Sequence, residues 1–316
     1  MKIAIVGPGA VGLLLAGYLR KTKAQIVLVD HLPERAAMLN ANGIHWEGMD
    51  GEVHFTVPVT VGLADPGSTD LAILCVKAYH TEIAARGLGA AGYHGPVLTL
   101  QNGVGNVEAI RRALPGSVIL AGTTSEGANL RDVNRVRHAG RGKTAFGLMG
   151  NDRNMGGFID ALASLMLDAG MDAEVSSDPQ SLIWGKVLVN AGINALTALL
   201  RVRNGRLLDI EPVRALMADL VREGWEVVKR KGLNPPYRDP VERVEEVCRL
   251  TAENFSSMYM DMKEGRMTEI GYINGAIVRE GAPLGIPCPC NGTVTAVIRG
   301  MEQVKGAAVE RGPVIK

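Results

Sequence analysis

The sequence is poor in several features that mark particular classes of protein. Its 316 residues include only four cysteines and only 4% aromatic residues. Four cysteines cannot form a disulfide framework in a chain of this length, which favours a reducing and hence cytoplasmic environment. The scarcity of aromatic residues beside 39 glycines argues against an aromatic-rich β-sandwich and for an α/β chain with glycine turns.

Concentrated charge and long apolar runs are lacking too. The 34 Lys and Arg nearly balance the 33 Asp and Glu, so the formal net charge is only +1. Nucleic acids and anionic membranes need a concentrated positive field, so we expect neither as a main partner. The first apolar run ends at Gly7, too early for a signal-peptide core, and no apolar stretch reaches the roughly 18 residues of a membrane span. These absences leave a soluble protein whose length favours two domains.

Two sequence patterns divide the chain near residue 176. Before it, continuous runs of Ile, Val, Leu and Ala alternate with amphipathic stretches, as in a doubly wound α/β domain with a parallel sheet. We expect strands at Lys2–Val6, Gln25–Val29, Leu71–Val76, Pro96–Leu100 and Ser117–Ala121, with shorter edge strands at Arg135–Ala139, Ala145–Leu148 and Ala173–Val175. After it, Asp178 and Pro179 are suited to begin a helix, and long helical segments follow. The sequence predicts a Rossmann-type domain over residues 1–176 and an all-helical domain over residues 177–316.

A glycine loop follows the first expected strand and begins a helical pattern. It has the form G-x-G-x-x-G and consists of Gly7, Pro8, Gly9, Ala10, Val11 and Gly12. In this context Gly7 allows a tight turn, Gly9 lets backbone amides approach a pyrophosphate, and Gly12 lets helix and strand pack closely. The helix N-terminus faces the phosphate charge. The loop therefore predicts a dinucleotide site, and a purely structural glycine turn is the weaker interpretation.

The second expected strand leads into Asp30, about 20 residues after the glycine loop. A carboxylate there can accept hydrogen bonds from an adenosine ribose and would repel a 2′-phosphate. This favours NAD(H) over NADP(H), although His31 and Arg35 are near enough in sequence to oppose that preference.

Two other expected strands are followed by polar residues. Lys77 comes after the strand Leu71–Val76, and Asn102 comes after Pro96–Leu100. Ligands of open α/β sheets bind at the carboxyl ends of the strands, which makes both residues candidates for the site. An Asn-Gly turn is also an ordinary structural device, so a scaffold role for either loop stays open.

A polar stripe marks the first predicted helix of the second domain. Over Leu182–Leu200 the sequence is apolar on nearly all sides except at Lys186, Asn190 and Asn194. Their spacing of four residues places them on one face. A buried polar group without a partner costs about 1–3 kcal/mol, and an ammonium is especially costly to desolvate. The stripe is better suited to binding and protonating a carbonyl substrate, with a satisfied network between helices as the alternative.

Ser257 and Glu269 are the remaining candidates in the helical half. Twelve residues of straight helix would hold them roughly 18 Å apart, so they share a site only if the chain breaks between them. Gly265 is the obvious place for such a break, and a plain surface carboxylate is the alternative for Glu269. The four cysteines and six histidines have no metal-ligand spacing, so we expect no metal.

In their order along the chain, these motifs resemble the ketopantoate reductase family. The resemblance covers nearly the whole chain and rests on the glycine loop, Val76-Lys77-Ala78, Gln101-Asn102-Gly103, Gly185-Lys186 with Asn190 and Asn194, Ser256-Ser257-Met258, Thr268-Glu269-Ile270 and Tyr272-Ile273-Asn274-Gly275. It implies a Rossmann domain followed by a helical domain similar to that of 6-phosphogluconate dehydrogenase, with the substrate held between them.

The resemblance also implies a reaction, the reduction of ketopantoate to (R)-pantoate by NAD(P)H in pantothenate and coenzyme A biosynthesis. Lys186 would be the general acid, and Glu269 would pair with it or orient it. Asn190, Asn194 and Ser257 would hold the carboxylate and hydroxyl of the substrate.

The same resemblance implies further residues beside the coenzyme. Lys77 would lie near its ribose. Asn102 would contact both coenzyme and substrate, and Glu269 would contact the coenzyme in addition to its role beside Lys186. Many members of the family carry a basic residue after the second strand and use NADPH, whereas this sequence has Asp30-His31.

Two other functions stay open from the sequence. A D-2-hydroxyacid dehydrogenase acting on another branched 2-keto acid would share Lys186 and Glu269 and differ in its pocket. A coenzyme-sensing protein without catalysis predicts loss of one of these residues, and both are present. We expect a homodimer with a small-molecule substrate, since apolar helical domains often pair.

Overall fold

The computed structural model describes residues 1–49, 51–151 and 153–310, in two compact units. The first unit comprises Met1–Gln101 and Gly105–Gln180, and the second comprises Asn102–Val104 and Ser181–Lys316. The passage at residue 180 lies close to the boundary expected at residue 176. The membership of residues 102–104 in the second unit has no counterpart in the sequence analysis.

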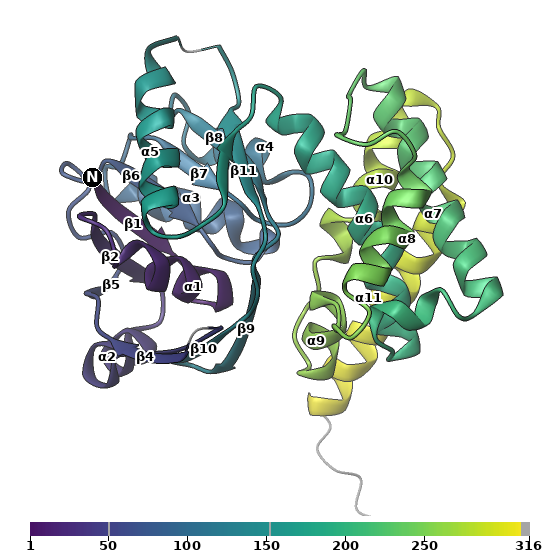
Figure 1. Cartoon of the computed structure of the whole chain (residues 1–316), viewed down its shortest axis with the longest axis horizontal. Coiled ribbons are helices and arrows are strands. Elements are labelled where there is room, and N and C mark those ends of the chain that lie inside the picture. The colour runs from purple at the N-terminus through teal and green to yellow at the C-terminus, as the bar shows by residue number, and fades with distance from the viewer. Residues whose placement is uncertain (50, 152, 311–316) are drawn as a thin grey trace, which may run out of the picture. The chain divides into compact units, whose positions relative to one another are not determined.

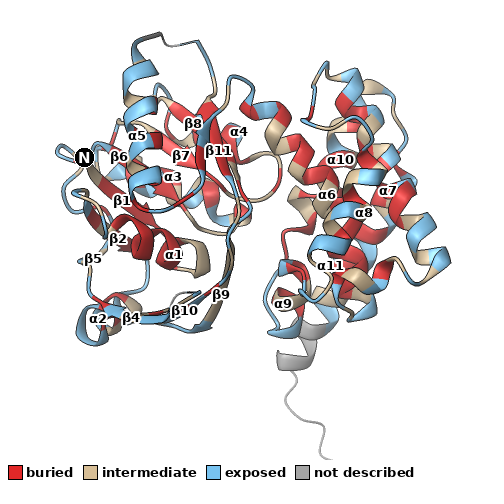
Figure 2. Cartoon of the chain, viewed as in Figure 1, coloured by how far each residue is buried: buried red, intermediate tan, exposed pale blue. Residues whose placement is uncertain are grey.

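The first unit is built on an eight-stranded sheet (Figure 1). In spatial order its strands are β12 (Ala173–Val175), β11 (Thr144–Leu148), β8 (Ile119–Thr124), β7 (Val97–Thr99), β6 (Leu71–Leu74), β1 (Lys2–Val6), β2 (Gln25–Asp30) and β5 (Val59–Val61). Every neighbouring pair is parallel except β11 with β8. Figure 2 shows buried residues along the central strands, which explains their continuous apolar sequences. The expected doubly wound α/β fold is confirmed.

Helices alternate with these strands along the chain. Among the described residues of this unit they are α1 (Ala10–Leu19), α2 (Pro33–Asn42), α3 (Thr81–Ala90), α4 (Asn106–Ala113) and α5 (Gly156–Asp168), with short 3₁₀ turns η1 (Ala78–His80) and η2 (Arg153–Met155). Helix α1 buries most of its length, which fits the helix that follows a glycine loop in a Rossmann domain.

A second sheet, of four strands, was not expected. Its strands are β4 (Gly51–Phe55), β3 (Ile44–Gly48), β10 (Arg135–Gly140) and β9 (Gly127–Asp132) in spatial order. The expectation that Arg135–Ala139 joins an edge of the main sheet is therefore wrong. In β10 only Val136 and His138 are buried, and such alternation is typical of a sheet that covers a core with one face.

The second unit is helical. Its helices are α6 (Pro179–Leu200), α7 (Glu211–Arg230), α8 (Pro240–Leu250), α9 (Ser257–Lys263), α10 (Asn274–Gly281) and α11 (Pro289–Glu310), with 3₁₀ turns η3 (Asn204–Leu207), η4 (Ile270–Tyr272) and η5 (Ala282–Leu284). Close helix packing requires Gly192, because a Cβ there would lie 2.9 Å from Val221 and from Val244. The expected break at Gly265 is confirmed, since α9 ends at Lys263 and Gly265 has a φ of +71°.

Helix α6 is the central element of this unit. Within the part of the chain that the structure describes, it is the one helix long and apolar enough to cross a membrane by length and hydropathy. A helix with the length and hydropathy of a membrane span was not expected from the sequence. However, 67% of its most apolar window is buried inside the protein, which is the pattern of a core helix.

Candidate active site

The glycine loop joins β1 to α1 in the first unit. Gly7 has a φ of +97°, and a Cβ there would lie 2.6 Å from a methyl carbon of Val76. A Cβ on Gly12 would overlap the carbonyl oxygen of Gly7, so this position also excludes a side chain. Gly9, the residue before α1, has no atom within 4 Å of its hypothetical Cβ. The geometry therefore fits a dinucleotide phosphate, with an open approach at Gly9 and the N-terminus of α1 behind it.

Asp30 ends β2, and its carboxylate is fully enclosed. Its Oδ1 accepts hydrogen bonds from the backbone amides of His31 (2.7 Å) and Leu32 (3.1 Å) and from Nη2 of Arg35 (2.7 Å). Its Oδ2 accepts a bond from Nε of Arg35. These bonds to Arg35 and the loop outweigh burial and lower the pKa of Asp30.

The carboxylate of Asp30 has partners that bear on its expected contact with a ribose. The side chain holds the turn into α2 and the guanidinium of Arg35, rather than offering free oxygen atoms to a ribose. Sequence proximity had indicated that Arg35 could interfere, but not that it would bind both carboxylate oxygens.

Lys77 and Gln101 lie in the loops after β6 and β7. Lys77 is half-buried and directly precedes η1. The side-chain amide of Gln101 donates to the carbonyl of Val76 (2.7 Å) and to the hydroxyl of Thr81 (2.8 Å), so it ties the two loops together. The sequence alone does not show that the amide of Gln101 reaches the loop after β6, so this role was not predicted.

Asn102 begins the three-residue segment that belongs to the second unit. Its Nδ2 donates to Oε2 of Glu269 at 3.3 Å. The next residues are fixed to the same region, since the amide of Val104 donates to the carbonyl of Tyr272 at 2.8 Å. The structure thus brings together two residues that are 167 positions apart and that the sequence analysis selected independently.

The polar stripe of α6 has the expected arrangement within the second unit. Lys186 and Asn190 are half-buried, and Asn194 is buried. Burial lowers the pKa of Lys186 to about 8, against the opposing effect of the Glu269 charge, which raises it. Glu269, which directly precedes η4, is itself buried. An ammonium near neutral pKa beside a carboxylate is suited to proton donation.

Ser257 is the first residue of α9 and is exposed. Its neighbour Ser256 is buried and caps the helix, with its hydroxyl accepting from the amide of Tyr259 (3.1 Å). The hydroxyl of Thr197 donates to Ser256 (2.7 Å), so α9 begins beside the part of α6 that lies about one turn after Asn194. The structure brings Ser256 rather than Ser257 into this network.

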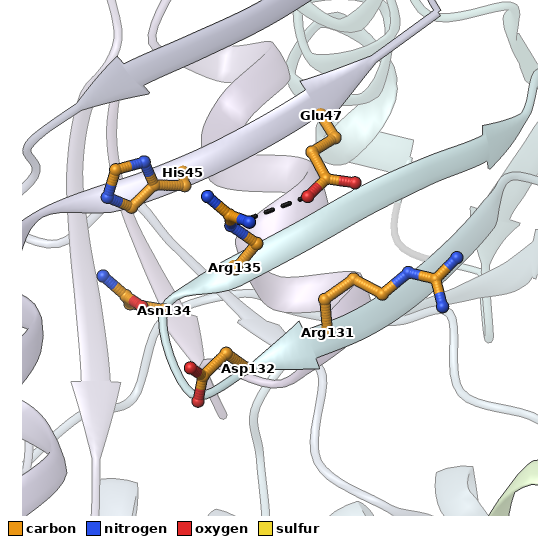
Figure 3. Close-up of a pocket in the computed structure, with 6 residues that line it drawn as sticks. All are labelled: His45, Glu47, Arg131, Asp132, Asn134 and Arg135. Carbon is orange, nitrogen blue, oxygen red and sulfur yellow. Dashed lines mark ion pairs between the residues drawn. The ribbon is translucent and has the colours of Figure 1, made fainter.

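A cavity outside the expected site lies elsewhere in the first unit. Its volume is about 550 Å³, and it lies on the second sheet, lined by His45, Glu47, Arg131, Asp132, Asn134 and Arg135 (Figure 3). Arg135 pairs with Glu47 there at 3.6 Å. None of the site residues expected from the sequence lines this cavity. Among the described residues, no group of three or more His, Cys, Asp or Glu side chains could hold a metal ion.

Comparisons with known proteins give matches over most of the chain. Residues 3–151 match the family model described as ketopantoate reductase PanE/ApbA, and residues 178–302 match the model of its C-terminal region. The chain is 35% identical to the 2-dehydropantoate 2-reductases of Halobacterium salinarum and of Archaeoglobus fulgidus, over 95% of this chain and 98% of each relative.

Solved structures also resemble the chain over nearly its whole length. A PanE/ApbA family ketopantoate reductase from Ralstonia eutropha is 30% identical with a TM-score of 0.88, over 97% of this chain and all of that one. A D-mandelate dehydrogenase solved with NADH and anilino(oxo)acetate is 26% identical with a TM-score of 0.88, over the same shares of the two chains.

Proposed function

The chain belongs to the ketopantoate reductase family, and from this premise we propose that it is a 2-dehydropantoate 2-reductase. It reduces ketopantoate to (R)-pantoate with NAD(P)H, as an oxidoreductase acting on a CH–OH group, in pantothenate and coenzyme A biosynthesis. The observation that carries the proposal is the half-buried Lys186 of α6, in one stripe with Asn190 and Asn194; burial lowers its pKa to about 8 against the opposing charge of Glu269.

Lys186 is the general acid in this proposal. The bound nicotinamide coenzyme supplies the hydride that C2 of the keto acid accepts. The Lys186 ammonium stabilises the negative charge that develops on the carbonyl oxygen and donates its proton there, which leaves a neutral amine and a hydroxyl group. Glu269 keeps the lysine protonated near neutral pH by raising its pKa against burial.

The remaining polar residues orient the substrate and the acid. Asn190 and Asn194, one and two turns beyond Lys186, bind the carboxylate and hydroxyl of the substrate. Asn102 donates to Glu269 and so fixes the carboxylate that acts on the lysine. Ser257 completes the substrate contacts from the exposed N-terminus of α9.

The coenzyme is a nicotinamide dinucleotide bound at Gly7–Gly12, beside Lys77. Preference for NADH rested on a free Asp30 carboxylate, and that carboxylate is neutralised by Arg35. With the charge of Asp30 masked, a 2′-phosphate is repelled less, so we propose that both NADH and NADPH are used.

A steady-state assay tests the reaction and the coenzyme together. NADH and NADPH oxidation would be followed with ketopantoate and with 2-oxoisovalerate, which lacks the hydroxyl group of ketopantoate. We expect the higher kcat/KM for ketopantoate. Equal or better turnover of 2-oxoisovalerate would contradict the assignment of ketopantoate as substrate, and no oxidation with any pair would contradict catalysis itself.

A D-2-hydroxyacid dehydrogenase is the second candidate. The likeness to a D-mandelate dehydrogenase over nearly the whole chain favours keeping it under test. Adding phenylglyoxylate, the keto acid of mandelate, to the same assay distinguishes the two. Higher kcat/KM for phenylglyoxylate than for ketopantoate would favour this second function.

We also propose a cytoplasmic homodimer. All four cysteines are free thiols, which agrees with a reducing compartment. The second unit exposes several large apolar side chains suited to association, namely Leu200, Met267, Val297 and Val304. Light scattering after gel filtration should give twice the chain mass of 33.6 kDa. A monomer at every concentration would contradict the dimer.

A further inference from the structure

A chain of buried amides crosses the second unit between four helices. Asn274, at the start of α10, donates from Nδ2 to the carbonyl oxygen of Ala191 in α6 and to Oδ1 of Asn291 in α11, each at 3.0 Å. Asn291 in turn donates to the carbonyl of Leu220 (2.9 Å) and to the carboxylate of Glu223 (2.7 Å), both in α7. Asn274 and Asn291 are completely buried.

The direction of every bond in this chain is determined. Leu220 and Glu223 offer only acceptors to Asn291, so the amide of Asn291 must turn its nitrogen towards α7. Its oxygen then faces Asn274, which must present its own nitrogen to Asn291 and to Ala191. The carboxylate of Glu223 also accepts from the backbone amides of Cys290 and Asn291, which fixes Glu223 itself at the N-terminus of α11.

An asparagine at position 274 costs folding free energy. Its Oδ1 is buried and has no hydrogen-bond partner in the part of the chain that the structure describes. An unsatisfied buried acceptor costs about 1–3 kcal/mol, which an apolar side chain would avoid. The donor side of the amide must therefore matter enough to keep asparagine there.

The two elements that Asn274 joins are the ones that carry the site. Ala191 directly follows Asn190 in the stripe of α6, and Glu269 lies five residues before Asn274. Between them, η4 is a tight turn in which the amide of Tyr272 donates to the carbonyl of Glu269 at 2.9 Å. A shift of Asn274 would therefore move Glu269 with it.

We infer that Asn274 is a positioning residue, which fixes the register of α6 against the segment of Glu269 through its bond to Ala191, with Glu223 and Asn291 setting the direction of its amide. It touches neither the reacting atoms nor the acid, and it acts through the separation of Lys186 and Glu269. The inference rests on the proposed function.

The test compares Asn274→Ala with Asn204→Ala in the full-length enzyme. Asn204 lies in η3 of the same unit, is buried, donates to the hydroxyl of Thr251 (2.9 Å) and also has an unpartnered Oδ1. Both variants lose a buried amide, so both should lose similar thermal stability. Of these two asparagines, Asn274 is the one whose side chain donates a hydrogen bond to α6, the helix that carries Lys186.

In Asn274→Ala, the pH profile of kcat should change. Glu269 raises the pKa of Lys186, so loosening the pair moves the alkaline limb to lower pH. A shift of one pH unit lowers kcat at pH 8 to 9 by up to about tenfold. The KM for ketopantoate should rise several-fold because Asn190 moves.

A second variant keeps the test decisive if Asn274→Ala does not fold. Glu223→Gln retains the shape of the side chain but replaces one of its two acceptor oxygens with an NH2 donor, which weakens the orientation of Asn291, and should shift the alkaline limb in the same direction by a smaller amount. An alkaline limb in Asn274→Ala and Glu223→Gln identical to that in Asn204→Ala would overturn the inference. An inactive wild-type enzyme would instead count against the proposed function.

Discussion

At the scale of single residues, we expect the protonation of Lys186 to set the pH range of the reaction. In the proposed mechanism the ammonium is the form that donates, and it is lost as the pH rises through about 8. We expect kcat for reduction to fall by about tenfold per pH unit above that value. In Glu269→Gln the charge that raises the pKa is gone, so the limb should begin at lower pH. An unchanged limb in that variant would contradict the role of Glu269.

The same lysine should limit stability. Its pKa is lower in the folded protein than the ordinary 10.5, so the penalty is fully present below about pH 8 and disappears as the pH rises towards 10.5. Lys186→Met should raise the free energy of unfolding at pH 7 by up to roughly 3 kcal/mol. It should also lower kcat by a few orders of magnitude with NAD(P)H affinity intact. Denaturant titration at pH 7 and pH 10 checks the sign, since the gain must shrink at pH 10.

Arg35 should determine how strongly Asp30 acts on the coenzyme. Arg35→Gln leaves the carboxylate of Asp30 with its two backbone donors but without the neutralising guanidinium. We expect the ratio of kcat/KM for NADH to that for NADPH to rise by about tenfold, because a 2′-phosphate is then repelled. Arg35→Lys, which keeps the charge, is the control. Equal ratios in all three proteins would mean that Asp30 does not influence the coenzyme.

Residue-scale reasoning succeeded where periodicity and composition were enough. The stripe of Lys186, Asn190 and Asn194 follows from helical spacing alone, and the structure has it on one helix. The coenzyme preference could not be predicted as readily, because the charge that Asp30 presents depends on the rotamer of Arg35, five residues away. A local sequence pattern does not determine whether such a pair forms.

At the scale of elements, two glycines in the turn between β1 and α1 should affect different properties: Gly12 the stability of the fold and Gly9 the binding of the coenzyme. Gly12→Ala would place a methyl group against the carbonyl of Gly7, so we expect loss of several kcal/mol of stability or no folded protein. Gly9→Ala meets no neighbour, so the protein should unfold at nearly the wild-type temperature. Its added methyl group should nevertheless raise the KM for NAD(P)H at least tenfold. A normal KM in Gly9→Ala would exclude the loop as the phosphate site.

The second sheet shows what element-scale prediction missed. Strand β9 is half-buried to exposed along its whole length and contains Arg131 and Asp132, so it has no apolar signature. It forms because β10 pairs with it and also with β3, which is about 90 residues earlier in the chain. Pairing at such separation leaves little trace in a local pattern, whereas the continuous strands of the main sheet were found.

At the scale of the whole molecule, residues 102–104 belong to the second unit although their neighbours in sequence belong to the first, and they carry Asn102, which donates to Glu269. Gly103 has a φ of +90°, and a Cβ there would lie 2.5 Å from the carbonyl oxygen of Tyr272. Gly103→Ala should therefore displace Asn102 from Glu269 and lower kcat/KM for ketopantoate by tenfold or more.

The control for this change is Gly116→Ala, at a φ of +87° with open space around it. Both substitutions strain the backbone, but only Gly103→Ala creates a collision. Equal kinetic effects of the two would contradict a specific role for the 102–104 segment. The membership of this segment in the second unit depends on contacts with residues about 170 positions later, which is why the sequence did not reveal it.

The apolar character of α6 has a consequence for biosynthesis. Most of its buried partners lie on helices that are translated after it, such as Met217, Val244 and Ile277. The nascent chain therefore exposes an apolar segment long enough to span a membrane before those partners have been synthesised. A lysine near the middle of such a segment disfavours insertion by about 2.5–3.5 kcal/mol. The side chain that we assign to proton donation should therefore also disfavour insertion of the nascent chain into a lipid bilayer.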